Sequence, residues 1–104
     1  MMQYNKLVRD KIAEFLDSKG ISYEKRIATD TEYRQELIKK LGEETKEFIE
    51  KEGSIEELAD IMEVIDALKK LPEFANVEEI KKEKLINKGG FEKRMILKGE
   101  KKFI

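Results

Sequence analysis

The sequence predicts an all-α protein, because helix-starting signals, helix-ending residues and apolar residues at helical spacing recur together along the chain. Ser, Thr or Asn is followed by Glu three residues later before each of three apolar segments, a pattern that caps the start of a helix. These pairs are Thr29 with Glu32, Ser54 with Glu57, and Asn76 with Glu79. The residues that end helices are Gly20, Gly53, Pro72 and the glycine pair at 89–90. We therefore expect helices at about 6–19, 30–51, 55–71 and 77–88.

Two segments do not have helical spacing. In 21–27, apolar side chains occupy three of four alternate positions, and 91–97 carries apolar residues after the glycine pair. Alternation of this kind is typical of a strand. The sequence therefore leaves open a short β-hairpin in which these two segments pair.

The 104 residues favour a single domain over 1–104. The segments 30–51 and 55–71 are separated only by a short turn at Gly53, so we expect them to form an antiparallel helix hairpin. A chain this short buries a small fraction of its surface, and both helices keep apolar positions that one copy hardly covers. We therefore expect a helical bundle completed by oligomerisation, as a homodimer or a homotetramer.

The composition narrows the possible functions. The chain has no histidine and no cysteine, which removes the commonest general base, the usual zinc ligands and thiol chemistry. Lys and Arg number 22 and Asp and Glu 23, so nothing indicates stable nucleic-acid binding. No apolar run is long enough to span a membrane and no signal peptide is recognisable, so we expect a cytoplasmic protein. Abundant carboxylates favour Mg²⁺, or Mn²⁺, over zinc.

Acids are too frequent for their spacing alone to identify a site, so the informative ones are those inside an apolar helix face. Successive residues of the segment 30–51 are rotated by about 100°, counted here from Tyr33. Its apolar stripe begins at Tyr33, the zero point, and continues past Leu37, at about 40°. Glu44 falls between these two residues, at about 20°. Glu47 falls one step outside the stripe, at about 320°.

The segment 55–71 repeats this arrangement. Counted from Glu57, the apolar stripe runs from Val64 at about 340° through Leu68 at about 20°, so Glu57 lies inside it. Asp60 lies just outside, at about 300°. Each helix thus carries one acid inside its apolar stripe and a second acid three residues later on its flank.

If the two helices face each other, Glu44, Glu47, Glu57 and Asp60 come together. Their mutual repulsion would be large without a cation between them, and hard oxygen ligands suit Mg²⁺. A purely structural role for the two embedded acids stays open. Glu57 could simply cap its helix, and Glu44 could pair with Lys40, four residues earlier.

Several segments resemble a known family. LGEETKEF and EELADIMEVIDAL are similar to the paired ExxE and ExxD motifs of the all-α nucleoside triphosphate pyrophosphatase superfamily, which includes MazG, phosphoribosyl-ATP pyrophosphohydrolase and dimeric dUTPases. The initial YNKLVRDKI and the late GGFEKR resemble small stand-alone MazG-related proteins. The resemblance covers nearly the whole chain, although the connection between Glu47 and Glu57 is shorter than in many relatives.

The resemblance implies an enzyme that hydrolyses the bond between the α and β phosphates of a nucleotide and releases a monophosphate and pyrophosphate. It implies Glu44, Glu47, Glu57 and Asp60 as ligands of Mg²⁺. Such chemistry requires charge neutralisation and an activated water, and we expect Glu44 or Glu47 to orient or deprotonate that water.

Phosphates also require basic groups. The candidates are Lys6, Arg9, Lys11, Arg26, Lys93 and Arg94. The function expected first is hydrolysis of non-standard nucleoside triphosphates, a house-cleaning activity. The alternatives are phosphoribosyl-ATP pyrophosphohydrolase of histidine biosynthesis, which would share the metal site, and a non-catalytic helical interaction module.

Overall fold

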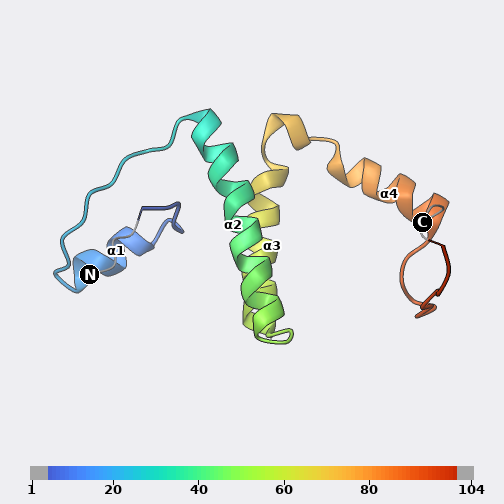
Figure 1. The fold of residues 1–104 in the computed structure, drawn as a ribbon. Helices are drawn as coiled ribbons and strands as arrows, with labels where there is room; N and C mark the ends of the chain where they lie inside the picture. The colour runs from blue at the N-terminus through green and yellow to red at the C-terminus, as the bar shows by residue number, and fades with distance from the viewer. Residues whose placement is uncertain (1–4, 101–104) are drawn as a thin grey trace. The chain divides into compact units, whose positions relative to one another are not determined.

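A computed structural model describes residues 5–100, and all regular structure within that range is helical. The helices are α1 (Ile12–Ser18), α2 (Asp30–Glu50), α3 (Ile55–Lys69) and α4 (Val77–Lys88), with a short 3₁₀ helix at Pro72–Phe74 (Figure 1). The all-α prediction is thus confirmed for the described chain. None of the helices in that range has the length and apolar character that a membrane span requires.

The chain divides after Phe74 into two compact units. The first contains α1, α2 and α3, and the second contains α4 and the segment that follows it. The expectation of one domain over 1–104 stays a prediction.

Helices α2 and α3 pack against each other as an antiparallel hairpin (Figure 1). Within the described residues, the buried apolar side chains are Leu37 of α2 and Val64 of α3, with exposed fractions of 4% and 8%. The two helices are joined by a tight turn in which Glu52 and Gly53 both adopt left-handed backbone, with φ of 54° and 94°. Glycine tolerates this conformation without the steric penalty of a side chain, so Gly53 permits the helices to reverse direction so quickly.

The start of α2 is fixed by a complete capping box. The Thr29 hydroxyl accepts a hydrogen bond from the Glu32 backbone N–H at 3.2 Å, and the Glu32 carboxylate accepts one from the Thr29 backbone N–H at 3.1 Å. The Arg26 guanidinium also donates to both oxygens of Glu32, at 2.8 and 2.6 Å. This arrangement satisfies backbone donors that the first helical turn otherwise leaves unpaired.

The other two predicted capping boxes are not formed. Neither Ser54 at α3 nor Asn76 at α4 makes a side-chain capping hydrogen bond. Asn76 has φ −101° and ψ 17°, away from the extended backbone that lets an N-cap side chain reach back. At α3 the carboxylate of Glu57 pairs instead with Lys51.

The predicted helix at 6–19 is wrong in its first half, because α1 begins only at Ile12. Its N-cap residue, Lys11, offers no capping side chain. The side chains of Lys6 and Arg9 pair with carboxylates on α2 and α3, at 3.8 Å from Glu43 and 3.4 Å from Asp60. These long-range pairs accompany a non-helical segment before α1.

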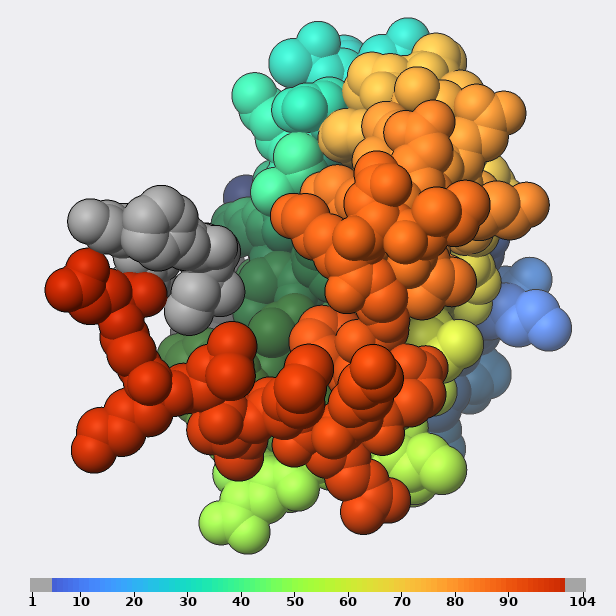
Figure 2. Space-filling view, turned by 90° about the vertical axis from the view of Figure 1, so that its right-hand side faces the viewer, coloured from blue at the N-terminus to red at the C-terminus, as the bar shows by residue number. Residues whose placement is uncertain are grey.

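The alternative of a β-hairpin is also wrong, because neither 21–27 nor 91–97 forms a strand. Ile27, Phe91 and Ile96 are 92%, 97% and 96% exposed, so these apolar side chains do not pack against the rest of the described chain. A strand requires a neighbouring strand for its backbone groups, and the described residues form none. Figure 2 shows the second segment (red) as part of an open loop after α4.

The Glu32 carboxyl predicts a specific acid sensitivity. Its pKa is lowered from 4.5 to about 2, first by the Arg26 side chain and then by the Thr29 backbone N–H. A carboxyl whose pKa is lower in the folded chain contributes stability above its unfolded pKa and loses it as the pH falls through the folded value. Between about pH 4.5 and pH 2, the urea midpoint of the wild type should therefore fall more steeply than that of Glu32→Gln.

Glu79→Gln is the matched control, because Glu79 holds the same position in α4, where no side-chain capping bond forms. That variant should keep the wild-type pH profile. If the midpoints of Glu32→Gln and the wild type ran parallel from pH 6 to pH 2, the capping box would have no such role.

Candidate metal centre

Helices α2 and α3 bring three of the four predicted acids together. One carboxylate oxygen from each of Glu44, Glu57 and Asp60 lies within 4.8 Å of the other two. Glu57 is only 6% exposed and Glu44 is half-buried, as the positions of both acids on the apolar stripes predict. Asp60 lies at the more open side of the group, with its side chain 40% exposed.

Two oxygens of this carboxylate cluster (Glu44, Glu57 and Asp60) are buried without a partner. Oε2 of Glu44 and Oε2 of Glu57 are inaccessible and accept no hydrogen bond from the described residues. The other oxygens are paired: Lys51 Nζ lies 2.6 Å from Glu57 Oε1, and Lys40 Nζ lies 4.0 Å from Glu44 Oε1. A buried carboxylate oxygen that accepts nothing is costly, so these two atoms favour a bound cation or a proton shared between the carboxyls, which lie within hydrogen-bonding reach of each other.

The two buried acids differ in their electrostatic environment. The pKa of Glu44 is raised, first by burial and then by the negative charges of Glu47 and Asp60. The pKa of Glu57 is lowered, first because it accepts a hydrogen bond from the Lys51 ammonium and further by hydrogen bonds with the carboxyls of Glu47 and Glu44, while its burial acts in the opposite direction. The two shifts run in opposite directions, so Glu57 favours its charged form and Glu44 its neutral form.

The donor set fits a hard divalent cation. All the converging atoms are carboxylate oxygens, the ligands that Mg²⁺ and Mn²⁺ prefer, and the described chain contributes no nitrogen or sulfur ligand. A divalent cation would partner the two orphaned oxygens and cancel the repulsion that raises the pKa of Glu44.

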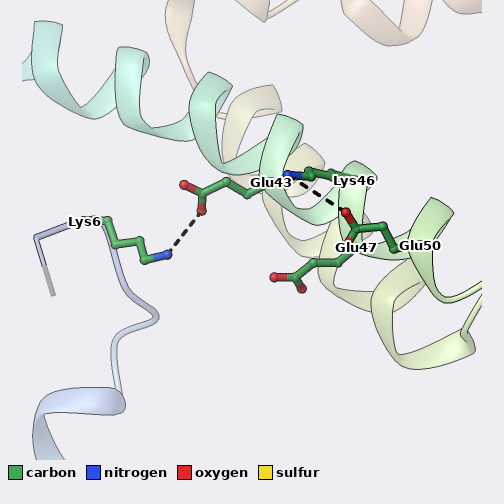
Figure 3. Close-up of a pocket in the computed structure, with 5 residues that line it drawn as sticks. All are labelled: Lys6, Glu43, Lys46, Glu47 and Glu50. Carbon is green, nitrogen blue, oxygen red and sulfur yellow. Dashed lines mark ion pairs between the residues drawn. The ribbon is translucent and has the colours of Figure 1, made fainter. Parts of the chain in front are cut away.

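Glu47 is placed differently from the other three. It is exposed and is not one of the three acids that converge, although its charge raises the pKa of Glu44 and its carboxyl hydrogen-bonds with Glu57, which lowers the pKa of Glu57. It lines an adjacent pocket of about 260 Å³ together with Lys6, Glu43, Lys46 and Glu50. Figure 3 shows the Lys6 ammonium reaching toward Glu43 across this pocket, and Lys46 paired with Glu50. Glu47 thus stands between the cluster and an open, polar space.

Two of the six predicted phosphate-binding residues lie near these acids. Arg9 contacts Asp60 at 3.4 Å and Glu63 at 3.7 Å, so its guanidinium borders the carboxylate cluster directly. Lys6 lies on the adjacent pocket. The ion pairs of Arg9 with Asp60 and Glu63, and of Lys6 with Glu43, are long and solvent-accessible, so each contributes little to stability.

The other four are not brought to the acids by any described contact. Arg26 is engaged with Glu32 in the cap of α2, and Lys11 is exposed at the start of α1. Lys93 and Arg94 belong to the second unit. Their assignment to substrate binding stays a prediction.

Sequence reasoning missed Lys51, the closest partner of any acid in the group. Its signal was weak, because its distance of six residues from Glu57 matches no helical spacing. Only the tight turn between α2 and α3 brings the two together. The pairing of Glu44 with Lys40 was anticipated, but at 4.0 Å it leaves Oε2 of Glu44 unpaired.

No protein-family model, curated protein or solved structure matches this chain.

Neutralising Glu44 should stabilise the protein in the absence of a divalent cation. Glu44→Gln keeps the shape of the side chain and removes a half-buried charge that Glu47 and Asp60 repel. We expect the free energy of unfolding to rise by about 1 kcal/mol, measured by thermal unfolding in EDTA. For a chain of this size, that gain corresponds to roughly 4–8 °C in Tm.

The control is Glu50→Gln, which removes a 61% exposed charge from the same helix. A surface pair of this kind contributes at most about 1 kcal/mol, so Tm should stay the same or fall slightly. A lower Tm for Glu44→Gln in EDTA would mean that its charge is compensated within the chain, and the inference of a vacant positive position would be wrong.

Proposed function

We propose that this protein is a Mg²⁺-dependent pyrophosphohydrolase of nucleoside triphosphates, which releases a nucleoside monophosphate and pyrophosphate. The observation that carries the proposal is the carboxylate cluster with its two orphaned buried oxygens. A chain that buries like charges at a loss of stability is typical of a functional site rather than of a structural core.

Glu44, Glu57 and Asp60 would hold the cation, and Glu47 would complete the set at its exposed edge. When bound, Mg²⁺ supplies neutralisation of phosphate charge and a lowered pKa for water. Glu47 lies at the pocket and is exposed, so it is placed to accept a proton from an attacking water. Glu44, with its raised pKa, is the other candidate for that role.

Arg9 and Lys6 supply positive charge beside the carboxylates. In the absence of substrate, their partners are Asp60, Glu63 and Glu43. A triphosphate carries more charge than any of these side chains, and it would compete for both cations. This supports their assignment to phosphate binding.

The same acidic site would serve phosphoribosyl-ATP, so hydrolysis of that compound remains the second candidate. The resemblance of the segment 4–12 to MazG-related proteins favours the house-cleaning activity. A non-catalytic interaction module is favoured by one observation, which is the number of apolar side chains left exposed on α2 and α3. They are Ile38, Ile49, Ile55, Leu58, Met62 and Ile65.

We propose that a second copy of the chain covers these exposed side chains, as a homodimer or homotetramer. Ile38 and Ile65 are 43% and 41% exposed, although the helical spacing places both on apolar stripes. Apolar area of this extent favours association in water. Light scattering at micromolar concentration should therefore give a multiple of 12.2 kDa, and the mass of one chain would contradict the proposal.

A panel of nucleotides incubated with Mg²⁺ tests the activity. Pyrophosphate should be released from at least one nucleoside triphosphate, and EDTA should abolish the release. Glu57→Gln should lower the rate at least about a hundredfold, because it removes a ligand from the site. The matched control is Glu56→Gln, a neighbouring exposed acid outside the cluster, which should keep the wild-type rate.

Release of inorganic phosphate instead of pyrophosphate would point to cleavage of a different bond. Hydrolysis of phosphoribosyl-ATP alone would favour the second candidate. If no nucleotide in the panel is hydrolysed and no cation stabilises the fold, the interaction module becomes the better account.

A further inference from the structure

The two oxygens of Glu57 have opposite roles. Oε1 accepts a hydrogen bond from the Lys51 ammonium at 2.6 Å, whereas Oε2 is buried and accepts none from the described residues. Glu57 also belongs to the carboxylate cluster, in which it stands within 4.8 Å of Glu44 and Asp60. Lys51 therefore donates to Oε1 of Glu57, while Oε2 of the same carboxylate has no hydrogen-bond donor among the described residues.

The turn between α2 and α3 fixes where Lys51 stands. Lys51 is the C-cap residue of α2, and its backbone N–H donates to the Glu47 carbonyl at 3.0 Å. The next two residues are left-handed, and the Gly53 N–H donates to the Phe48 carbonyl at 2.9 Å. This turn places Lys51 next to the first turn of α3. Glu57 lies in that turn, so the Lys51 ammonium can reach its carboxylate.

The start of α2 has the same sequence pattern as the start of α3, but there the glutamate caps the helix. Arg26, Thr29 and Glu32 have the same spacing as Lys51, Ser54 and Glu57: a basic residue, a capping residue three later, and a glutamate three later again. At α2 the glutamate completes the capping box and binds arginine, with its side chain 36% exposed. At α3 the capping bond is absent and the glutamate is buried.

The chemistry of the basic residue accounts for part of this difference. The arginine fork spans both oxygens of Glu32, while the Thr29 N–H shares one of them. A lysine ammonium is a single point of charge and occupies one oxygen. Glu57 makes no capping bond with Ser54, and its second oxygen has no hydrogen-bond donor among the described residues.

We propose that Lys51 is a positioning residue, which withdraws Glu57 from the helix cap and presents its free oxygen to a divalent cation. This inference rests on the cation site proposed above. It assigns to Lys51 a role in the geometry of the site, without contact to the cation or the substrate.

The sign of the effect separates positioning from simple charge. Lys51 is a positive group next to a cation site, so by charge alone its removal should tighten cation binding. If Lys51 positions Glu57, its removal should weaken binding, because Glu57 is then free to cap α3 or to change rotamer. Partners that orient metal ligands typically change metal affinity by about 10–100-fold.

The experiment is a titration of the full chain with Mn²⁺, in which free Mn²⁺ is followed by electron paramagnetic resonance. It is carried out well below the Tm of each variant, so that a loss of global stability does not alter the result. Lys51→Met should weaken binding by about 10–100-fold. Lys51→Arg should also weaken binding, because an arginine fork would occupy both oxygens of Glu57, as Arg26 does at Glu32.

Lys39→Met is the matched control, because Lys39 is also an exposed lysine of α2 and does not line the pocket that contains Glu47. It should bind Mn²⁺ like the wild type. If Lys51→Met does not fold, Lys51→Gln, which shortens the side chain and removes its charge, takes its place with the same expectation. Unchanged or tighter binding by the variant would overturn the positioning role.

Failure of the two proposals gives different results. A wild-type chain that binds no Mn²⁺ overturns the cation site itself, and the inference with it. A wild type that binds Mn²⁺, with Lys51→Met binding equally well, overturns only the role of Lys51.

Discussion

The structure of the first unit depends on a conflict between hydrophobic packing and charge at the interface of α2 and α3. The same helix faces that bury Leu37 and Val64 also bury the carboxylate of Glu57 and half-bury that of Glu44. The two acids face each other because the hairpin is held in register by its short turn. The chain compensates one oxygen of each with a lysine and leaves the other oxygen of each unpaired. A divalent cation between the carboxylates, as proposed above, would resolve the conflict without changing the packing.

The small core has a related consequence. Few apolar side chains in the described range are buried, while many on α2, α3 and α4 remain exposed. A hairpin of two helices offers each apolar stripe only one neighbour, so the stripe is covered on one side alone. The proposed second copy of the chain would cover the exposed part of these stripes. The carboxylate cluster itself comes entirely from one hairpin.

Local sequence signals correctly predicted where α2, α3 and α4 begin. Contacts between residues far apart in the sequence could not be predicted in this way. Helices α2, α3 and α4 begin at the residues that the capping patterns and apolar spacing indicated. The predicted start of α1 was wrong, and in the non-helical segment before Ile12, Lys6 and Arg9 pair with acids on α2 and α3, which no local pattern reveals. The burial of Glu57 followed from its place on the apolar stripe, since a hairpin buries the face that carries the stripe. The pairing of Glu57 with Lys51 could not be predicted from the sequence. It depends on the tight turn after Lys51, in which Glu52 adopts left-handed backbone. The segments 21–27 and 91–97 had the alternation of strands but no partner to pair with among the described residues.

The central claim is that a divalent cation occupies the position between the carboxylates of α2 and α3. Anomalous diffraction from crystals grown with Mn²⁺ tests it most directly, because Mn²⁺ substitutes for Mg²⁺ at oxygen sites and scatters anomalously. We predict a peak at about 2.1 Å from oxygens of Glu44, Glu57 and Asp60, including the two that are unpaired here. Peaks confined to exposed acids elsewhere, with Glu44 and Glu57 still unpaired, would contradict the claim.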